Sequence, residues 1–113
     1  CMIRLKENQN VGIAVNGIAH ASLKCYLAFQ NKPDMIEWKD TSFHKFTCSV
    51  TEKEFEYAKQ FSDFVVVTES TLDKAEICLA FCPRQEWPKC FAFYRPFGKD
   101  LVRQPLDKPD QLW

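Results

Sequence analysis

The most informative segment of the sequence is residues 11–29, VGIAVNGIAHASLKCYLAF, in which Lys24 is the only residue of the Asp, Glu, Lys and Arg types. Its apolar residues recur at three- and four-residue spacing and predict a long helix, which Asn10 can cap with its side-chain oxygen. The residues expected on one face are Ala14, Ile18, Ala21, Ser22, Cys25 and Phe29. Apolar residues also fill most of the remaining surface, so we expect cover on a second side from another helix, a tail or a partner subunit. Gly17 costs a helix about 1 kcal/mol relative to Ala, which predicts that another segment approaches its backbone closely.

Strand and helix patterns alternate along the rest of the chain. The expected strands are residues 1–5, 43–50, 64–68 and 75–81. A second long helix is expected from Thr51 to about Phe61, because Thr51 and Glu54 have the spacing of a capping box. Residues 35–38 fit either a short strand or a second small helix.

The order of these elements predicts an α/β fold. The short connection between the last two strands favours an antiparallel pair, and the helical crossovers favour parallel pairs among the others. The length of 113 residues suits one domain. We therefore expect a single α/β domain over residues 1–113, with a core at about 1–95 and an irregular tail at about 96–113, where Trp113 is expected to dock on the body.

Composition limits the classes of function. The 15 basic and 15 acidic residues balance, which disfavours tRNA or other nucleic acid as a partner. No apolar stretch is long enough to predict a membrane span. The six cysteines are Cys1, Cys25, Cys48, Cys78, Cys82 and Cys90. Their positions in apolar runs favour reduced thiols over disulfides or a metal site, so we expect a cytoplasmic protein with no metal and no cofactor.

Two polar features stand out as candidate ligand-binding groups. Asn16 is the only amide in the first half of the apolar helix, and a buried amide there would need a partner. The loop after the third strand supplies further candidates, namely Glu69, Ser70, Thr71 and Asp73. If the first and third strands run in the same direction, this loop, the start of the first helix, Lys6 and Glu7 meet at one end of the sheet, where open α/β sheets bind ligands.

Several strings in the sequence match a known fold. Residues 2–5 (MIRL), 12–21 (GIAVNGIAHA) and 64–73 (FVVVTESTLD) resemble the type 2 peptidyl-tRNA hydrolase fold. Residues 77–88 (ICLAFCPRQEWP) are similar to the closing segment of the DUF2000 family, whose members have the same fold. The resemblance covers roughly residues 1 to 90 and implies a three-layer α/β/α domain with a mixed four-stranded sheet.

The resemblance also implies an activity and a set of site residues. Type 2 peptidyl-tRNA hydrolases cleave the ester between peptide and tRNA without a metal, and they are commonly dimers. Asn16 stands where the family has a catalytic glutamine, and Glu69 stands where it has an aspartate. The lysine-containing loop of the family is replaced here by residues 7–10 (ENQN), and Thr71 is offset from the family threonine.

These observations leave three hypotheses. The first is a small-ligand-binding or non-catalytic protein of this fold, whose pocket is lined by Asn16, Glu69, Ser70, Thr71 and Asp73. The second is a divergent esterase or peptidyl-tRNA hydrolase-like enzyme in which Glu69 or Asp73 orients water. The third is a structural homodimer that pairs through the first helix.

Overall fold

The computed structural model describes residues 1–92 and 95–97 and confirms a mixed α/β fold. Its elements in chain order are β1 (Met2–Lys6), α1 (Val11–Phe29), α2 (Pro33–Thr41), β2 (Phe46–Val50), α3 (Glu52–Ala58), β3 (Phe64–Glu69), η1 (Ser70–Leu72), β4 (Ala75–Phe81), η2 (Lys89–Ala92) and β5 (Arg95–Pro96). The boundaries of α1 and β4 agree with the sequence prediction. No helix in the described part of the chain has the length and hydropathy that crossing a membrane requires.

The sheet has five strands in the order β3-β4-β1-β2-β5, so the expectation of four strands is wrong for this structure. The additional strand is β5, where Arg95 and Pro96 pair with Ser49 and Cys48 of β2. β1 and β2 are parallel, and β3 and β4 form the expected antiparallel pair. The crossover through α3 gives β3 no parallel neighbour, because β4 lies between β3 and β1 and is antiparallel to both. β1 and β3 therefore run in the same direction.

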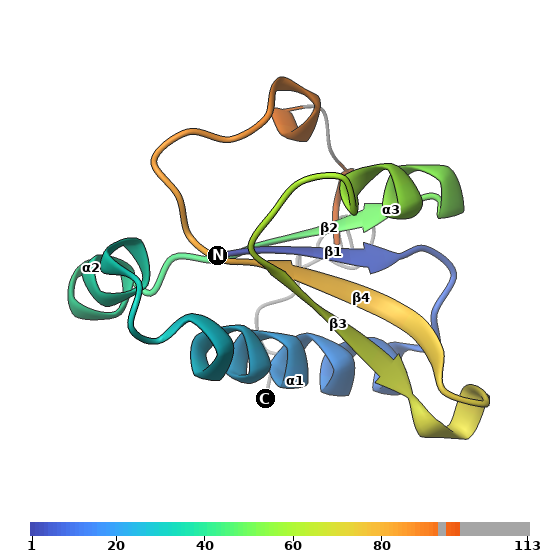
Figure 1. Ribbon diagram of the computed structural model, residues 1–113. Coiled ribbons are helices and arrows are strands. Elements are labelled where there is room, and N and C mark those ends of the chain that lie inside the picture. The colour runs from blue at the N-terminus through green and yellow to red at the C-terminus, as the bar shows by residue number, and fades with distance from the viewer. Residues whose placement is uncertain (93–94, 98–113) are drawn as a thin grey trace, which may run out of the picture.

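Helices cover both faces of the sheet (Figure 1). On one face, α1 packs on a core that includes Ile3, Leu5 and Ile77. On the other face, Phe55 of α3 and Phe91 of η2 pack on residues of β1, β2 and β4. This alternation follows from the pleat of the strands, whose successive side chains point to opposite faces.

The first helix begins and packs as its sequence predicts. The Asn10 side chain accepts hydrogen bonds from the backbone N–H groups of Gly12 and Ile13. Ala14, Gly17, Ala21 and Cys25 are its buried residues. A Cβ on Gly17 would lie 2.8 Å from Cδ1 of Ile77, so the close approach predicted from this glycine is confirmed.

Other local predictions are resolved or corrected. Residues 35–38 belong to α2, which begins at Pro33. The capping box of Thr51 and Glu54 is present, but α3 ends at Ala58 instead of about Phe61, because the following residues bond to carbonyls only three positions back. Most of the tail, including Trp113, lies outside the described residues.

Candidate functional site

The carboxyl ends of β1 and β2 define the strongest candidate ligand site. These strands are parallel neighbours, yet β1 leads into α1 on one face and β2 leads into α3 on the other (Figure 1). Such a reversal opens a crevice beyond the strand ends, which is where open α/β sheets bind ligands. The structure has a hollow of about 220 Å³ there, lined by Lys6, Glu7, Asn8, Gln9, Val50 and Glu52. We call it the β1–β2 hollow.

Backbone and charge contacts fix the walls of the β1–β2 hollow. The N–H of Glu7 donates to the carbonyl of Val50 over 2.9 Å, which extends the pairing of the two strands by one bond. Nζ of Lys6 lies 2.9 Å from Oε1 of Glu52 and 4.5 Å from the ring centroid of Phe55. Asn8 has a φ of 67°, a left-handed conformation that asparagine tolerates better than most residues. This left-handed residue is one of those that line the hollow.

Arg95 of β5 connects this loop to α3. Its Nη2 lies 2.9 Å from Oε1 of Glu54 and 3.8 Å from Oε2 of Glu7. The same Glu54 oxygen accepts the backbone N–H of Thr51 over 2.8 Å. These bonds, first that of Thr51 and then that of Arg95, hold the pKa of the Glu54 carboxyl below its usual value. Glu54 is therefore a structural anion beside the hollow, and its charge is already compensated.

The loop after β3 satisfies its own polar groups. Oε1 of Glu69 accepts from the backbone N–H of Thr71 over 3.2 Å and from the Thr71 hydroxyl over 2.9 Å. Ser70, Thr71 and Asp73 are exposed, and Asp73 has a φ of 54°. The shared direction of β1 and β3 puts this loop at the predicted end of the sheet, together with Lys6 and Glu7. The loop is separated from the β1–β2 hollow by the width of β4, and none of its residues lines that hollow.

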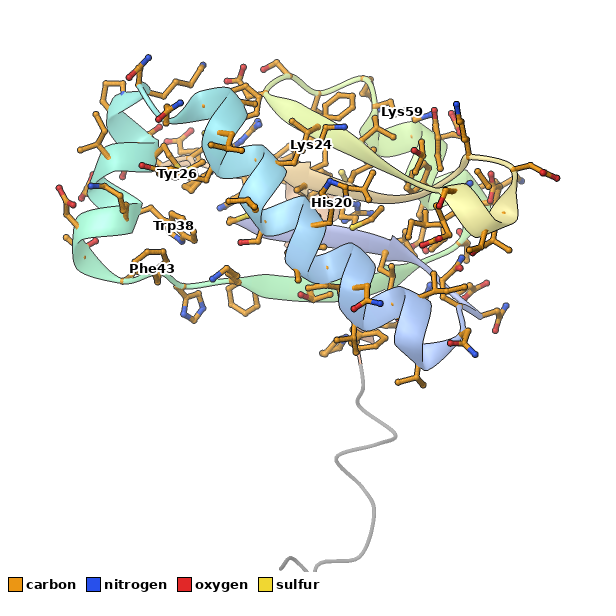
Figure 2. All side chains as sticks on the ribbon, turned by 90° about the horizontal axis from the view of Figure 1, so that it is seen from below. His20, Lys24, Tyr26, Trp38, Phe43 and Lys59 are labelled. Atoms are coloured by element: carbon orange, nitrogen blue, oxygen red, sulfur yellow. The ribbon has the colours of Figure 1, made fainter. Side chains whose placement is uncertain are left out.

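Asn16 does not occupy the buried position that the apolar helix suggested. It is exposed on α1, because the buried stripe of that helix runs through Ala14, Gly17 and Ala21. His20 and Lys24 follow at four-residue intervals on the side of α1 that faces β3 (Figure 2). Nζ of Lys24 donates to the carbonyl of Val66 over 2.7 Å and so covers part of the outer edge of the sheet.

The described residues contain no assembled nucleophile and base. In residues 1–92 and 95–97, no hydrogen bond joins a Ser, Thr or Cys side chain to the imidazole ring of His20 or His44; the Ser42 hydroxyl accepts only from the backbone N–H of His44. The described cysteines are free thiols, and burial raises the pKa of Cys78 to about 12 and that of Cys25 to about 11. Within the same ranges, no group of three His, Cys, Asp or Glu residues is arranged to hold a metal ion.

A second hollow lies between α1 and α2. It measures about 270 Å³ and is lined by Ala19, Ser22, Leu23, Tyr26, Trp38, Lys39 and Phe43. Figure 2 shows Tyr26, Trp38 and Phe43 together between the two helices. Phe43 is 57% exposed at a φ of 53°, and its ring centroid lies 5.0 Å from that of Trp38. This hollow continues the exposed apolar surface of α1.

Sequence reasoning placed Lys6 and Glu7 at this end of the sheet but missed Asn8, Gln9 and Glu52. The signal for these residues was their position directly after two strands that a long helical crossover makes parallel.

Comparisons with protein-family models, with curated proteins and with solved structures found no match to this chain.

Proposed function

We propose that this chain is a small-ligand-binding, non-catalytic protein with a peptidyl-tRNA hydrolase II-like fold of the DUF2000 type. The observation that carries the proposal is the β1–β2 hollow at the reversal point of the sheet. Its walls offer one ammonium group, two carboxylates and two side-chain amides, which together donate and accept hydrogen bonds. This mixture suits a small polar molecule without a strong net charge.

The residues that stand at the catalytic positions of type 2 peptidyl-tRNA hydrolases support binding over catalysis. Glu69, the candidate for orienting water, already accepts two hydrogen bonds from Thr71. Asn16 is exposed and lies outside the β1–β2 hollow. The loop at residues 7–10 supplies no lysine, and the ammonium of Lys6 is already paired with Glu52 over 2.9 Å. An ester oxygen would therefore lack a free cation of the kind that type 2 peptidyl-tRNA hydrolases provide in this loop.

A small ester and an aminoacyl-tRNA ester, tested in parallel, separate binding from hydrolysis. The probe is N-acetylalanine ethyl ester, which carries the amide and ester of a peptidyl-tRNA terminus, and N-acetylaminoacyl-tRNA is tested in parallel. We expect ligand-observed NMR to detect binding of the ester to wild type, with weaker binding to Lys6→Met. We expect both substrates to hydrolyse no faster than in buffer. Hydrolysis by wild type that is lost in Glu69→Ala and Asp73→Ala would establish the esterase alternative instead.

The surface of α1 favours a second candidate function, a structural homodimer. Val11, Val15, Leu23 and Leu27 are each more than half exposed along this helix. A continuous apolar stripe of this kind is typical of helix–helix interfaces. Light scattering at tens of micromolar protein tests the candidate: we expect a dimer that Leu23→Glu dissociates, and a wild-type monomer would exclude it.

A further inference from the structure

Arg4 is a buried cation in the middle of the sheet. It lies on β1, the central strand, between neighbours β4 and β2, and only 5% of its surface is exposed. Its side chain is on the α3 face of the sheet, because it alternates with Ile3 and Leu5, which pack under α1. A fully buried arginine is uncommon unless an anion compensates its charge.

No such anion is bonded to Arg4 in residues 1–92 and 95–97. Its Nη1 lies 4.0 Å from the Cys48 sulfur, a weak acceptor, and its Nε has no hydrogen-bond partner. The guanidinium carbon lies 4.4 Å from the centroid of the Phe91 ring, which attracts the cation but accepts no strong hydrogen bond. Leaving a buried charge unpaired is costly, so these contacts indicate a missing partner.

The guanidinium lines a hollow with room for such a partner. The hollow measures about 270 Å³ and is lined by Arg4, Lys53, Glu54, Tyr57 and Cys90. That volume is room for about nine water molecules, or for a molecule smaller than a typical drug. We call it the Arg4 hollow.

The charges around the Arg4 hollow favour an anion. Arg4 and Lys53 contribute two positive charges to its walls. Among the described residues that line the hollow, the one carboxylate is that of Glu54, which is already bonded to the Thr51 N–H and to Arg95. The hollow is therefore positive overall, and the planar guanidinium fork matches the two oxygens of a carboxylate or phosphate group.

We propose that the Arg4 hollow binds a small organic anion, a carboxylate or a phosphate ester on an apolar body. The oxyanion accepts from the guanidinium, and the apolar body lies against Tyr57. This site is distinct from the β1–β2 hollow, with which it shares no lining residue. The proposal goes beyond the proposed function and does not depend on it.

The test is isothermal titration calorimetry of the full chain with three matched probes at constant ionic strength. Benzoate carries a carboxylate and phenyl phosphate carries a phosphate, each on a phenyl ring. Benzamide is the neutral counterpart of benzoate. We expect wild type to bind benzoate or phenyl phosphate, and the stronger of the two identifies the oxyanion. Benzamide should bind at least about tenfold more weakly, because it cannot form charge-assisted hydrogen bonds as an anion.

Three variants make the assignment specific. Arg4→Met should weaken oxyanion binding about tenfold or more, since it removes the fork while retaining similar volume. Arg84→Met is the matched control: Arg84 also stacks on aromatic rings, but it lies outside this hollow and should leave binding unchanged. Lys53→Met changes an exposed residue of the hollow and should weaken binding even where Arg4→Met fails to fold. Three results would overturn the proposal. Wild type binds neither oxyanion, it binds benzamide as tightly as the oxyanions, or the Arg4→Met and Lys53→Met variants bind the oxyanion as tightly as wild type does.

Discussion

The packing of Gly17 against Ile77 provides a quantitative test of how α1 sits on the sheet. Carbon atoms in favourable contact are about 3.5–4.0 Å apart, and a Cβ at position 17 would lie 2.8 Å from Cδ1 of Ile77. Gly17→Ala should therefore overpack the contact at a cost of about 1–3 kcal/mol, offset by about 1 kcal/mol of helix propensity. The expected net loss of stability is about 0–2 kcal/mol.

Removing the opposing methyl group should reverse that loss. Ile77→Val alone deletes Cδ1 and should cost about 0.5–1.5 kcal/mol. In the double variant the new Cβ occupies the space of the deleted methyl, and the gain in helix propensity offsets the smaller side chain. We therefore expect the Gly17→Ala, Ile77→Val double variant to lie within about 0.5 kcal/mol of wild type.

Urea unfolding followed by circular dichroism measures the four free energies of this cycle. If the double variant equals wild type, the two single losses imply a favourable coupling of about 0.5–3.5 kcal/mol between the substitutions. Additive losses in the double variant would show that the two groups do not touch, and the packing of α1 on β4 described above would be wrong.

Four further predictions concern single residues. Arg4→Met loses a ring contact worth about 0.5–2 kcal/mol but removes an unpaired buried charge, so the free energy of unfolding in urea should be unchanged or higher; a loss of more than about 1 kcal/mol would contradict this. Thr51→Ala should lower the free energy of unfolding by about 1 kcal/mol because it removes the N-cap, whereas Thr51→Ser should retain it. The pKa of Glu54 is lowered in the folded state, so its contribution to stability is present above the unfolded-state pKa and is lost as the pH falls through the folded-state pKa. The stability difference between wild type and Glu54→Gln should accordingly shrink on acidification below about pH 4.5, and a difference that grows would refute the assignment. Among the described cysteines, Cys90 is exposed whereas burial raises the pKa of Cys78 to about 12, so peptide mapping after brief iodoacetamide treatment should find Cys90 alkylated first.

The fold was predictable from sequence where local signals agree with packing. The apolar pattern of 11–29 and its Asn10 cap located α1, and the capping box at Thr51 located the start of α3. Gly17 predicted a close approach by another segment, and Ile77 of β4 makes that approach. Each of these features depends on residues within one helical turn, or on the absence of a side chain, and so is visible in the sequence.

The features that the sequence did not predict depend on tertiary contacts. The pairing of Arg95 and Pro96 with β2 has no hydrophobic alternation to mark it, so the fifth strand was missed. Asn16 is exposed because the buried stripe of α1 consists of small residues. Apolar residues occur all round this helix, so the sequence pattern alone did not separate its buried side from its exposed side. Arg4 did leave a signal: it is a charged residue inside the apolar run MIRL, but only the structure shows that it faces a hollow without an anion.

The most direct test of the ligand-binding account is a protein-observed NMR titration with N-acetylalanine ethyl ester. Backbone ¹H–¹⁵N resonances report which residues the ligand perturbs. Binding in the β1–β2 hollow should give saturable shifts at Lys6, Asn8, Gln9 and Glu52, which line it, with little change along α2. Saturable shifts confined to the hollow between α1 and α2, or no shifts at all, would contradict it.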